Sequence, residues 1–572
     1  MPNQDQTIAY FSLEIGLESS IPTYSGGLGV LAGDTIRAAA DLGLPLVAVT
    51  LLYRKGYFRQ QLDADGQQTE LPVAWNPDDV LEEMPQRAFV PIDGRDVMLR
   101  AYRLWIDGCT GHRVPVYLLD TDLDKNDDAA RTLTHSLYAG DPDHRVRQEA
   151  VLAIGGKRML RALTHDVAVH HMNEGHAFLV TLELLSEHLS RYQKQQIDAA
   201  AIAYARDRCV FTTHTPVPAG HDRFDVGMVR SIVGDHPLLR RPDLYGEAEA
   251  GSAASASDNV LNTTKVALNL SRFANAVAQK HGEVSREMFP GYPIAAITNG
   301  VHAATWTSPS MRELFDRAVP KWRRSNSDLR LVQGVPAEAI REAHAASKRA
   351  LLAEVGRRVG RAFDPGAFTV AFARRATAYK RPAMLLSDLD RIAWLAERVG
   401  PLQVLYAGKA HPHDGTGAGI IREIVRKGRD LEGKVEVVFC ENYDIDLCRL
   451  LVAGVDLWLN NPEPPLEASG TSGMKAALNG VPSLSTLDGW WLEGWVEGVT
   501  GWAIEGEADS AAELYAVHAD SLYDKLANSI MPMYYREPER WAEVMRSCVA
   551  INGSYFTTER MVREYGLRAY WS

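Results

Sequence analysis

Short runs of apolar, often β-branched residues recur along the whole chain and alternate with longer helical stretches. This alternation is typical of a parallel sheet that is covered by helices on both faces. In the first half of the chain it predicts strands at residues 8–14, 44–53, 114–120, 167–173, 209–215 and 294–300. In the second half it predicts strands at residues 368–375, 402–409, 435–441, 456–461, 482–488 and 499–504.

The two sets of strands are separated by residues 306–365, which are mainly charged and helical in pattern. A chain of 572 residues is also too long for one core, because single hydrophobic cores stop growing at about 250 to 300 residues. We therefore expect an α/β protein with two Rossmann-like, doubly wound domains that face each other across a cleft. The expected domains are residues 1–305 and 306–572, with the tail at about 550–572 packing across their junction.

Composition and charge narrow the range of partners. Hydrophobic residues make up 46% of the chain and charged residues 23%, as in ordinary globular proteins. The formal net charge of -12 argues against nucleic acid as the main partner, because binding to a phosphate backbone requires clustered lysine and arginine. The five cysteines are scattered and no signal peptide or membrane-length apolar run is visible, so we expect a cytoplasmic protein with no membrane partner.

Polar and glycine-rich segments follow the predicted strands. In doubly wound folds the ligand binds beyond the carboxyl ends of the strands, so these segments are the candidates for a site. The histidines among them lack the spacing of common metal sites, and no metal is expected. The segments are GGLG (26–29), NEGH (173–176), THTPVPAGH (213–221), TNGVH (298–302), RRATAYKR (374–381), GKAHP (408–412) and EASGTSGMK (467–475).

The segment EASGTSGMKAALN, residues 467–479, carries the strongest signal. It follows a predicted strand and leads into a helix, so backbone N–H groups of Gly470, Thr471 and Ser472 would point together where the helix dipole favours an anion. Such a loop can cradle a phosphate. Lys475 follows within one helical turn and could hold a phosphate-bearing aldehyde cofactor as a Schiff base. Taken alone, the segment also fits a glycine-rich loop with a solvated lysine.

The same segment resembles the cofactor-lysine signature of the glycogen and maltodextrin phosphorylases, with the lysine at Lys475. RRATAYKR resembles the basic segment KRxxxYKR of that family. Further stretches resemble the family in the same order along nearly the whole chain, and together they identify a short, bacterial-type member of the α-glucan phosphorylase family. These stretches are SGGLG, LYRKGYF (52–58), LYAGD (137–141), RQE (147–149), NEGH, TTHT (212–215), TNG followed by Trp306, and GKAHP.

The resemblance implies the GT-B glycosyltransferase fold, pyridoxal 5'-phosphate as cofactor and a homodimer. It implies phosphorolysis of terminal α-1,4-linked glucose from glycogen or maltodextrin, which yields α-D-glucose 1-phosphate with retention of configuration. The cofactor phosphate would relay a proton to inorganic phosphate, so no pair of catalytic carboxylates is needed. The long animal and yeast members of the family have an N-terminal regulatory extension before the first strand. This chain enters its first predicted strand almost at once, so we do not expect allosteric regulation.

The resemblance also assigns roles at matching positions. Catalytic roles are implied for Lys475, Arg375, Lys380, His214 and Glu467. Cofactor binding is implied for Lys475, Arg374, Lys380, Tyr443, Gly470, Thr471, Ser472 and Gly473. Substrate binding is implied for Gly26, Gly27, Gly29, Asp141, His214, Asn299, Glu467, Ser469 and Gly470.

Each role has a structural alternative. Asn299 precedes a glycine and could simply form a turn. His214 follows a buried strand, as many structural histidines do. RRATAYKR could be a solvated basic patch, although its position after a buried strand argues against that. Trp490, Trp491 and Trp495 could stack on sugar, but core packing is the preferred interpretation.

Two other functions fit parts of the sequence. A nucleotide-sugar glucosyltransferase such as a glycogen synthase shares the two-domain fold and the GGLG loop, but it has no use for the lysine of SGTSGMK. A catalytically silent glucan-binding homologue would keep the fold, yet Lys475, Arg375 and Lys380 are all present. The sequence does not decide the preferred glucan length, the oligomeric state or the net direction of the reaction.

Overall fold

The structure is a computed structural model and describes residues 6–138, 140–246 and 259–571. The chain forms two compact units. Unit 1 takes the residues up to Tyr57, Pro72–Ile297 and the residues from Met561 onward, whereas unit 2 takes Phe58–Leu71 and Thr298–Arg560. The predicted α/β fold class is confirmed in both units. The assignment of separate binding roles to two domains divided at residue 305 stays a prediction.

Unit 1 is built on a nine-stranded sheet in the order β13-β12-β9-β8-β1-β2-β7-β6-β5. The strands from β13 to β7 run parallel, and β6 and β5 add an antiparallel hairpin at one edge. The hairpin was not predicted, because its residues alternate between buried and exposed positions and form no apolar run. The strands are β1 (Thr7–Phe11), β2 (Leu46–Leu51), β5 (Glu82–Ile92), β6 (Arg95–Asp107), β7 (Arg113–Asp120), β8 (Val167–Asn173), β9 (Cys209–Thr212), β12 (Phe273–Ala276) and β13 (Ile294–Ala296).

Strand β1 shows why this sheet is buried on both faces. Ala9 and Phe11 belong to a core that includes α3 (Pro142–Ala150) and α5 (Val180–Arg191). Ile8 and Tyr10 belong to a second core that includes α1 (Gly27–Leu42) and the C-terminal segment. Because successive side chains of a strand point to opposite faces, a strand between two cores must be apolar at every position.

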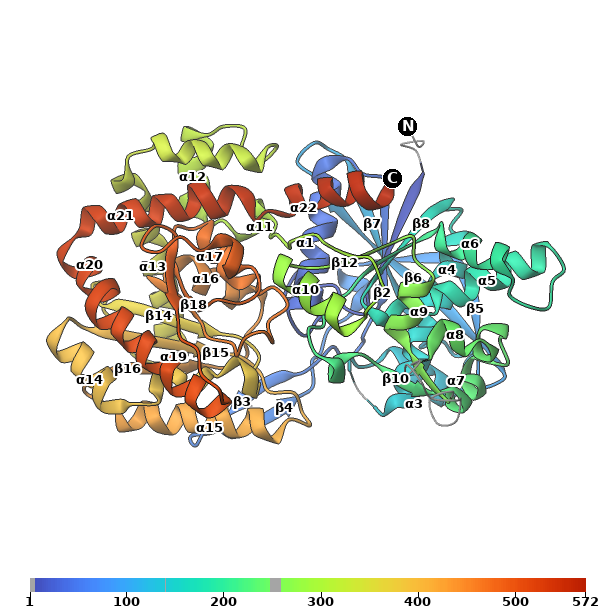
Figure 1. Ribbon diagram of the computed structural model, residues 1–572, viewed down its shortest axis with the longest axis horizontal. Coiled ribbons are helices and arrows are strands. Elements are labelled where there is room, and N and C mark those ends of the chain that lie inside the picture. Colours follow the sequence, from blue (N-terminus) through green and yellow to red (C-terminus); the bar gives the residue numbers. More distant parts are fainter. Residues whose placement is uncertain (1–5, 139, 247–258, 572) are drawn as a thin grey trace. The chain divides into compact units, whose positions relative to one another are not determined.

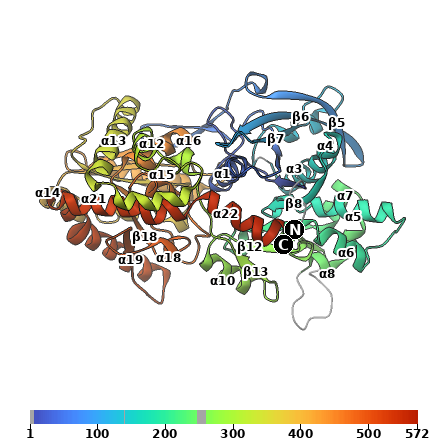
Figure 2. The same cartoon turned by 90° about the horizontal axis from the view of Figure 1, so that it is seen from above.

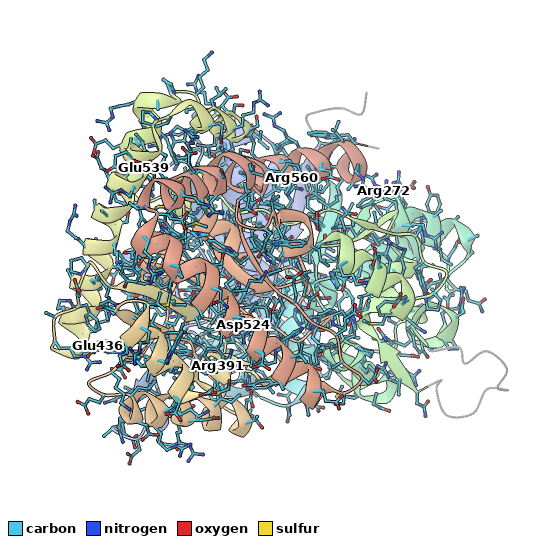
Figure 3. The ribbon with its side chains drawn as sticks, turned by 60° about the vertical axis from the view of Figure 1, so that its left-hand side comes forward. Arg272, Arg391, Glu436, Asp524, Glu539 and Arg560 are labelled. Carbon is cyan, nitrogen blue, oxygen red and sulfur yellow. The ribbon has the colours of Figure 1, made fainter. Side chains whose placement is uncertain are left out.

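The C-terminal segment is an integral part of unit 1. Tyr565, at the end of α22 (Thr558–Tyr565), contacts the hydroxyl of Thr212 at 3.0 Å. The hydroxyl of Tyr570 lies 2.7 Å from Nδ1 of His171. Arg272, labelled in Figure 3, donates a hydrogen bond of 2.8 Å to the carbonyl oxygen of Tyr570. The segment is therefore bound by side chains of the sheet as well as by its apolar face.

Unit 2 contains a parallel six-stranded sheet in the order β16-β15-β14-β17-β18-β19. Counted along the chain, this is the order 3-2-1-4-5-6 of the Rossmann fold. Figure 1 and Figure 2 show α19 on one face of the sheet and α13 and α16 on the other. The strands are β14 (Phe368–Ala373), β15 (Leu402–Ala407), β16 (Glu436–Cys440), β17 (Leu457–Asn460), β18 (Ser483–Thr486) and β19 (Gly501–Ile504), and the helices named are α13 (Ala337–Val359), α16 (Ile445–Gly454) and α19 (Ala511–Lys525).

The remaining elements complete the two units. Each of the strands predicted from the sequence overlaps a strand of the structure, and the region at 306–365 is helical as predicted. Among the residues that the structure describes, no helix has both the length and the hydropathy needed to cross a bilayer.

The remaining elements of unit 1 are α2 (Asp128–Arg131), α4 (Gly156–Ala162), α6 (Ala199–Arg206), α7 (Val226–Val233), α8 (Pro242–Tyr245), α9 (Thr263–Asn269), α10 (Gln279–Met288), β10 (Arg223–Asp225) and β11 (Val260–Asn262). In unit 2 they are β3 (Arg59–Leu62), β4 (Gln68–Leu71), α11 (Ala303–Trp306), α12 (Pro309–Ala318), α14 (Leu389–Arg398), α15 (Gly415–Asp430), α17 (Ser472–Ala477), α18 (Trp491–Gly494), α20 (Met531–Arg536) and α21 (Pro538–Ser547).

Each of the two large sheets has one place where its strand order reverses. In unit 1 this place lies between β1 and β8, and in unit 2 it lies between β14 and β17. In doubly wound folds, loops that leave the two central strands there diverge, and the ligand-binding crevice lies at the carboxyl edge of the sheet. The residues that follow β1, β8, β14 and β17 are therefore the ones that the fold itself selects for a site.

Candidate active site

The crevice of unit 2 holds one carboxylate against two cations. Arg374 directly follows β14, and Glu467 comes from the loop after β17. Nη2 of Arg374 lies 2.6 Å from Oε2 of Glu467, and Nζ of Lys380 lies 3.4 Å from the same oxygen. All three side chains are largely buried. The structure thus brings together three residues to which the sequence assigned one site.

Burial and charge determine the protonation states of this cluster. Burial alone would raise the pKa of Glu467, but the neighbouring Arg374 and Lys380 lower it to about 2. Burial, followed by repulsion from Arg374, lowers the pKa of Lys380 to about 7, although Glu467 acts in the opposite direction. At neutral pH Glu467 is ionised and Lys380 is close to its midpoint.

The lowered pKa makes the positive charge of this crevice depend on pH. We expect the affinity for sulfate, which keeps its double charge near neutrality, to weaken as the pH rises from 6 to 8, because Lys380 loses its proton in this range. One unit above its pKa only about a tenth of an amine is charged. Isothermal titration calorimetry should show this decline in the native protein and a flatter profile in Lys380→Met. Equal profiles in both proteins would show that the pH dependence of sulfate binding does not come from Lys380.

The same shift has a defined effect on stability. Because the pKa of Lys380 is lower in the folded chain than in the unfolded chain, the unfolded chain binds more protons above about pH 7. The contribution of Lys380 to stability therefore rises as the pH increases above about 7. Below that pH Lys380 destabilises the fold, because the buried side chain keeps its charge.

Two polar atoms of this crevice have no partner among the described residues. They are Nη1 of Arg374 and the hydroxyl oxygen of Ser469, and both atoms are buried. Buried polar groups are nearly always hydrogen-bonded in folded proteins, so each such atom requires an explanation. A guanidinium N–H needs an acceptor and a hydroxyl accepts or donates. A ligand that carries oxygen atoms would satisfy both.

Lys475 lies in α17 with 5% of its surface exposed. Its Nζ is 3.9 Å from the centre of the Trp306 ring, and no described residue accepts a hydrogen bond from it. The Asn479 side-chain amide donates to the carbonyl oxygens of Lys475 at 3.0 Å and Trp306 at 2.8 Å, which fixes the backbone of both. No ion pair joins Lys475 to Arg374 or Glu467 among the described residues. Lys475 is therefore a buried amine without an acceptor, as an amine used for covalent attachment would be.

The turn before α17 requires glycine. Gly470 has a φ of 85°, in the left-handed region that side chains disfavour. The next residue, Thr471, makes no side-chain cap to α17, whereas the Ser472 hydroxyl accepts a hydrogen bond of 3.0 Å from Nε1 of Trp458. A Cβ on Gly473 would lie 2.7 Å from the Trp490 ring. The phosphate cradle expected from these residues stays a prediction.

The other predicted residues of unit 2 are more dispersed. Arg375 is exposed beside Arg374, and Tyr443 is half-buried after β16. Asn299 is buried, and its carbonyl oxygen accepts a hydrogen bond of 2.9 Å from Arg560, which Figure 3 labels. The side-chain oxygen of Asn299 has no partner among the described residues, so a turn role alone leaves it unexplained.

In the crevice of unit 1 a buried glutamate caps the GGLG segment. The backbone N–H groups of Ser25 and Gly26 donate to Oε2 of Glu14 at 2.6 and 3.1 Å. The Gly26 amide is thus already used, and the phosphate role expected for it would require this carboxylate to move. Gly27 and Gly29 lie in the first turn of α1, where N–H groups have no acceptor within the helix, and their roles stay predictions.

His214 is held by Asn173, the last residue of β8, and by Glu174, which follows it. Its Nε2 lies 2.7 Å from the side-chain oxygen of Asn173, and its backbone N–H donates to Glu174 at 2.7 Å. Asn173 in turn donates to the hydroxyl of Ser12, after β1. Burial lowers the pKa of His214 to about 3. The neutral ring donates from Nε2 and leaves Nδ1 as an acceptor.

Asp141 has a structural task in unit 1. Its side chain accepts a hydrogen bond of 2.9 Å from the His144 N–H and so caps α3. Asp141 is exposed. The cap explains the residue without a ligand, and its role in substrate binding stays a prediction.

One further cluster in unit 1 has ligand-type side chains. Among the described residues, Glu149, His176 and Asp222 form the set whose ligand atoms lie within 4.8 Å of one another. Arg145 lies 2.7 Å from Asp222 and supplies positive charge. Burial raises the pKa of Glu149 well above its ordinary value, and the negative charge of Asp222 acts in the same direction. We assign no metal to the cluster.

The aromatic segment after β18 is packed inside unit 2. Trp490 is 2% exposed and Trp491 is 1% exposed. The Trp490 ring meets Trp491 and Phe556 at centroid distances of 5.1 and 4.9 Å. Core packing is therefore the role of both tryptophans. Trp495 is partly exposed and donates to Glu497 at 2.9 Å.

Sequence reasoning missed two carboxylates of the crevices. Glu14 follows β1, and Asp488 follows β18 and accepts a hydrogen bond of 2.8 Å from the Glu467 N–H. Each is the last residue of a predicted strand. The rule that selects strand ends applies to them equally, but neither belongs to a glycine-rich or basic segment, which is why they were overlooked.

Comparison with known proteins identifies similar chains. A family model described as carbohydrate phosphorylase matches residues 247–496. The maltodextrin phosphorylase of Thermococcus litoralis is 37% identical over 99% of this chain and 70% of its own length. The glycogen phosphorylase of Mycobacterium tuberculosis is 40% identical over 98% of this chain and 70% of its own length. The glycogen phosphorylase of Aquifex aeolicus is 33% identical over 98% of this chain and 85% of its own length.

Proposed function

This chain belongs to the carbohydrate phosphorylase family, and from that premise we infer that it is an α-glucan phosphorylase. It is a glycosyltransferase that uses inorganic phosphate to release glucose 1-phosphate from an α-1,4-glucan. The observation that supports this function most directly is the buried carboxylate of Glu467 against Arg374 and Lys380 at the switch point of unit 2. Cations in such a place suit anionic substrates, and the carboxylate suits sugar hydroxyls.

The positive charges answer an electrostatic requirement. If two phosphate groups approach each other in one site, each pair of unit charges about 4 to 5 Å apart costs on the order of 3 to 4 kcal/mol at an effective dielectric near 20. Arg374, Arg375 and Lys380 are the cations that would offset this repulsion. Arginine offers a planar fork of donors that matches phosphate, and lysine offers a compact charge.

We also propose hydrogen-bonding partners for the sugar. We propose that Glu467, Ser469 and Gly470 contact glucose hydroxyls, and that Asn299 contacts another. Ser469 and Asn299 each have a buried oxygen without a partner among the described residues, which supports these roles. His214 would accept a hydrogen bond from a sugar hydroxyl at Nδ1, since its Nε2 is hydrogen-bonded to Asn173.

In phosphorolysis the bond between the anomeric carbon and the glycosidic oxygen breaks. An oxygen of inorganic phosphate bonds to that carbon, and a proton carried by the phosphate moves to the departing oxygen. Both events occur on one face of the sugar, so configuration is retained. No carboxylate has to attack the sugar, which suits Glu467, because its oxygen is already bound to two cations.

We propose that the cofactor is pyridoxal 5'-phosphate. The residues fit this group: Lys475 is a buried amine without an acceptor, and Nη1 of Arg374 is a buried donor without one among the described residues. Lys475 would hold the cofactor, and Arg374, Lys380, Tyr443 and the 470–473 turn would surround it. When bound, the cofactor would supply a phosphate group that exchanges a proton with the substrate phosphate.

One assay tests the proposal against its rivals. We expect the purified protein to release glucose 1-phosphate from maltooligosaccharides of graded length in the presence of phosphate, and to show no turnover with ADP-glucose or UDP-glucose. A coupled glucose 1-phosphate assay measures both. Turnover with a nucleotide sugar but not with phosphate would establish a synthase instead. Binding of maltodextrin with no product from either donor would establish an inactive homologue.

We also propose, from family membership, that the enzyme is a cytoplasmic homodimer. Light scattering after size-exclusion chromatography would measure the mass of the assembly. The graded oligosaccharides in the assay above would give the preferred glucan length, which neither the sequence nor the fold decides.

A further inference from the structure

The segment Asp488–Trp490 holds the loop that carries Glu467. At one end, Oδ2 of Asp488 accepts a hydrogen bond of 2.8 Å from the Glu467 N–H. At the other end, the Trp490 N–H donates to the carbonyl oxygen of Ser469 at 2.9 Å. The second oxygen of Asp488 accepts from the Gly489 N–H at 2.8 Å. Two neighbouring chain segments are thus fixed to each other at both ends.

Close packing leaves no room between these segments. A Cβ on Gly489 would lie 2.4 Å from the carbonyl oxygen of Ser469 and would meet it before any ordinary contact distance. Gly489 also has a φ of 53°, which favours glycine. The Trp490 ring packs beneath the same loop, 2.7 Å from a Cβ built on Gly473. The loop therefore cannot shift without losing hydrogen bonds or packing.

Glu467 is held at two points as a result. Its carboxylate is bound by Arg374 and Lys380, and its backbone N–H is bound by Asp488. We propose that Asp488 is a positioning residue for the sugar- and phosphate-binding crevice: it fixes the backbone of Glu467 so that the carboxylate stays between the two cations. The kinetic part of this inference rests on the proposed phosphorylase function.

The charges that face Asp488 support a role that depends on its ionisation. Burial raises the pKa of Asp488 to about 7, Glu467 acts in the same direction, and the two N–H donors and Arg374 act against it. Tyr379 and Arg381 also face it. A protonated carboxyl group has fewer oxygens free to accept hydrogen bonds. The hold on Glu467 therefore weakens as the pH falls through about 7.

The first test is the pair Asp488→Asn and Asp388→Asn. Asp388 is a matched carboxylate that accepts the Arg391 N–H at 2.9 Å and caps α14, on the flank of unit 2 where Arg391 pairs with Asp524 (Figure 3). We expect Asp488→Asn to lower kcat/KM by up to ~10²-fold, the scale of a misplaced catalytic group. It should also lose the part of the pH profile near pH 7 in which native activity falls on acidification. Asp388→Asn should keep the native value and profile.

A second variant separates position from charge. Gly489→Ala pushes against Ser469 without changing any ionisable group, so we expect a similar loss of kcat/KM with the native pH profile. If Asp488→Asn lowers only the melting temperature and keeps both kcat/KM and the pH profile, the residue is structural and the inference is overturned. Native kcat/KM in Gly489→Ala would overturn it as well.

A readout that does not use activity separates this inference from the proposed function. Displacement of Glu467 removes a charge that raises the pKa of Lys380. The pH midpoint of sulfate binding should therefore move to lower pH in Asp488→Asn. If the native protein makes no glucose 1-phosphate, the proposed function fails while this shift still supports the positioning role. An unchanged midpoint would overturn the positioning role even if the native enzyme is active.

Discussion

Lys475→Ala is expected to lower the rate of glucose 1-phosphate release by up to ~10⁴-fold, because the proposed cofactor supplies the acid–base step. The reason is that the Lys475 amine is largely buried beside the Trp306 ring, where it is the lysine proposed to hold the cofactor. The near-ultraviolet absorbance of the bound cofactor should disappear together with the activity. Both are measured on the purified variant.

Lys475→Arg is the matched control for charge. Arginine keeps the cation over the Trp306 ring but cannot form a Schiff base, so we expect it to be as inactive as the alanine variant. Borohydride reduction of the native enzyme should leave a mass adduct on the peptide that contains Lys475. An adduct on a different lysine, or an active arginine variant, would refute the cofactor assignment. The fold should persist in both variants, because Asn479 binds the backbone carbonyl of residue 475 and not its side chain.

Glu467→Gln is expected to cost about 3 to 5 kcal/mol of stability, because it leaves the buried cations Arg374 and Lys380 without their counter-charge. It should also lower kcat/KM by ~10²- to 10³-fold, on the scale of a lost charged hydrogen bond of about 3 to 4 kcal/mol. The pKa of Lys380 should fall below its native value of about 7, since Glu467 raises it. Thermal unfolding measures the loss of stability, and steady-state kinetics measure the loss of kcat/KM.

A double variant separates stability from function. In Glu467→Gln with Arg374→Met the buried charge is removed together with its partner, so stability should recover in part while activity stays low. Asp456→Asn is the control for a buried pair away from the site, since Asp456 lies 2.6 Å from Lys348. It should destabilise to a similar extent and leave KM for phosphate unchanged. Recovery of activity in the double variant would contradict the role of Glu467.

The sequence predicted those parts of the fold that depend on burial. Strand β1 lies between two cores, so its run of apolar residues was a clear signal. The hairpin of β5 and β6 was invisible, because one of its faces is partly exposed and its pattern resembles that of a polar segment. The residues from Met561 onward belong to unit 1. The tail was expected to pack across the junction of the domains, which stays a prediction, but a contact across several hundred residues leaves no local pattern that would assign it to a unit.

The candidate site was predicted to a similar degree. Arg374, Lys380 and Glu467 belong to motifs at the carboxyl ends of predicted strands. In the structure the two cations form salt bridges with Glu467. The sequence could not show that the Gly26 amide is used by Glu14, because that contact depends on how the loop after β1 folds back. It also could not show Asp488 beneath Glu467, since the hydrogen bond joins segments of two neighbouring strands. Such details depend on tertiary geometry.

The order of the chain constrains how this protein can be made. Tyr565 and Tyr570, which complete one core of unit 1, are translated after all of unit 2. During synthesis domains generally fold from the N-terminal end as they emerge from the ribosome. One face of the N-terminal sheet, which α1 covers in part, therefore becomes complete only after α22 has been released.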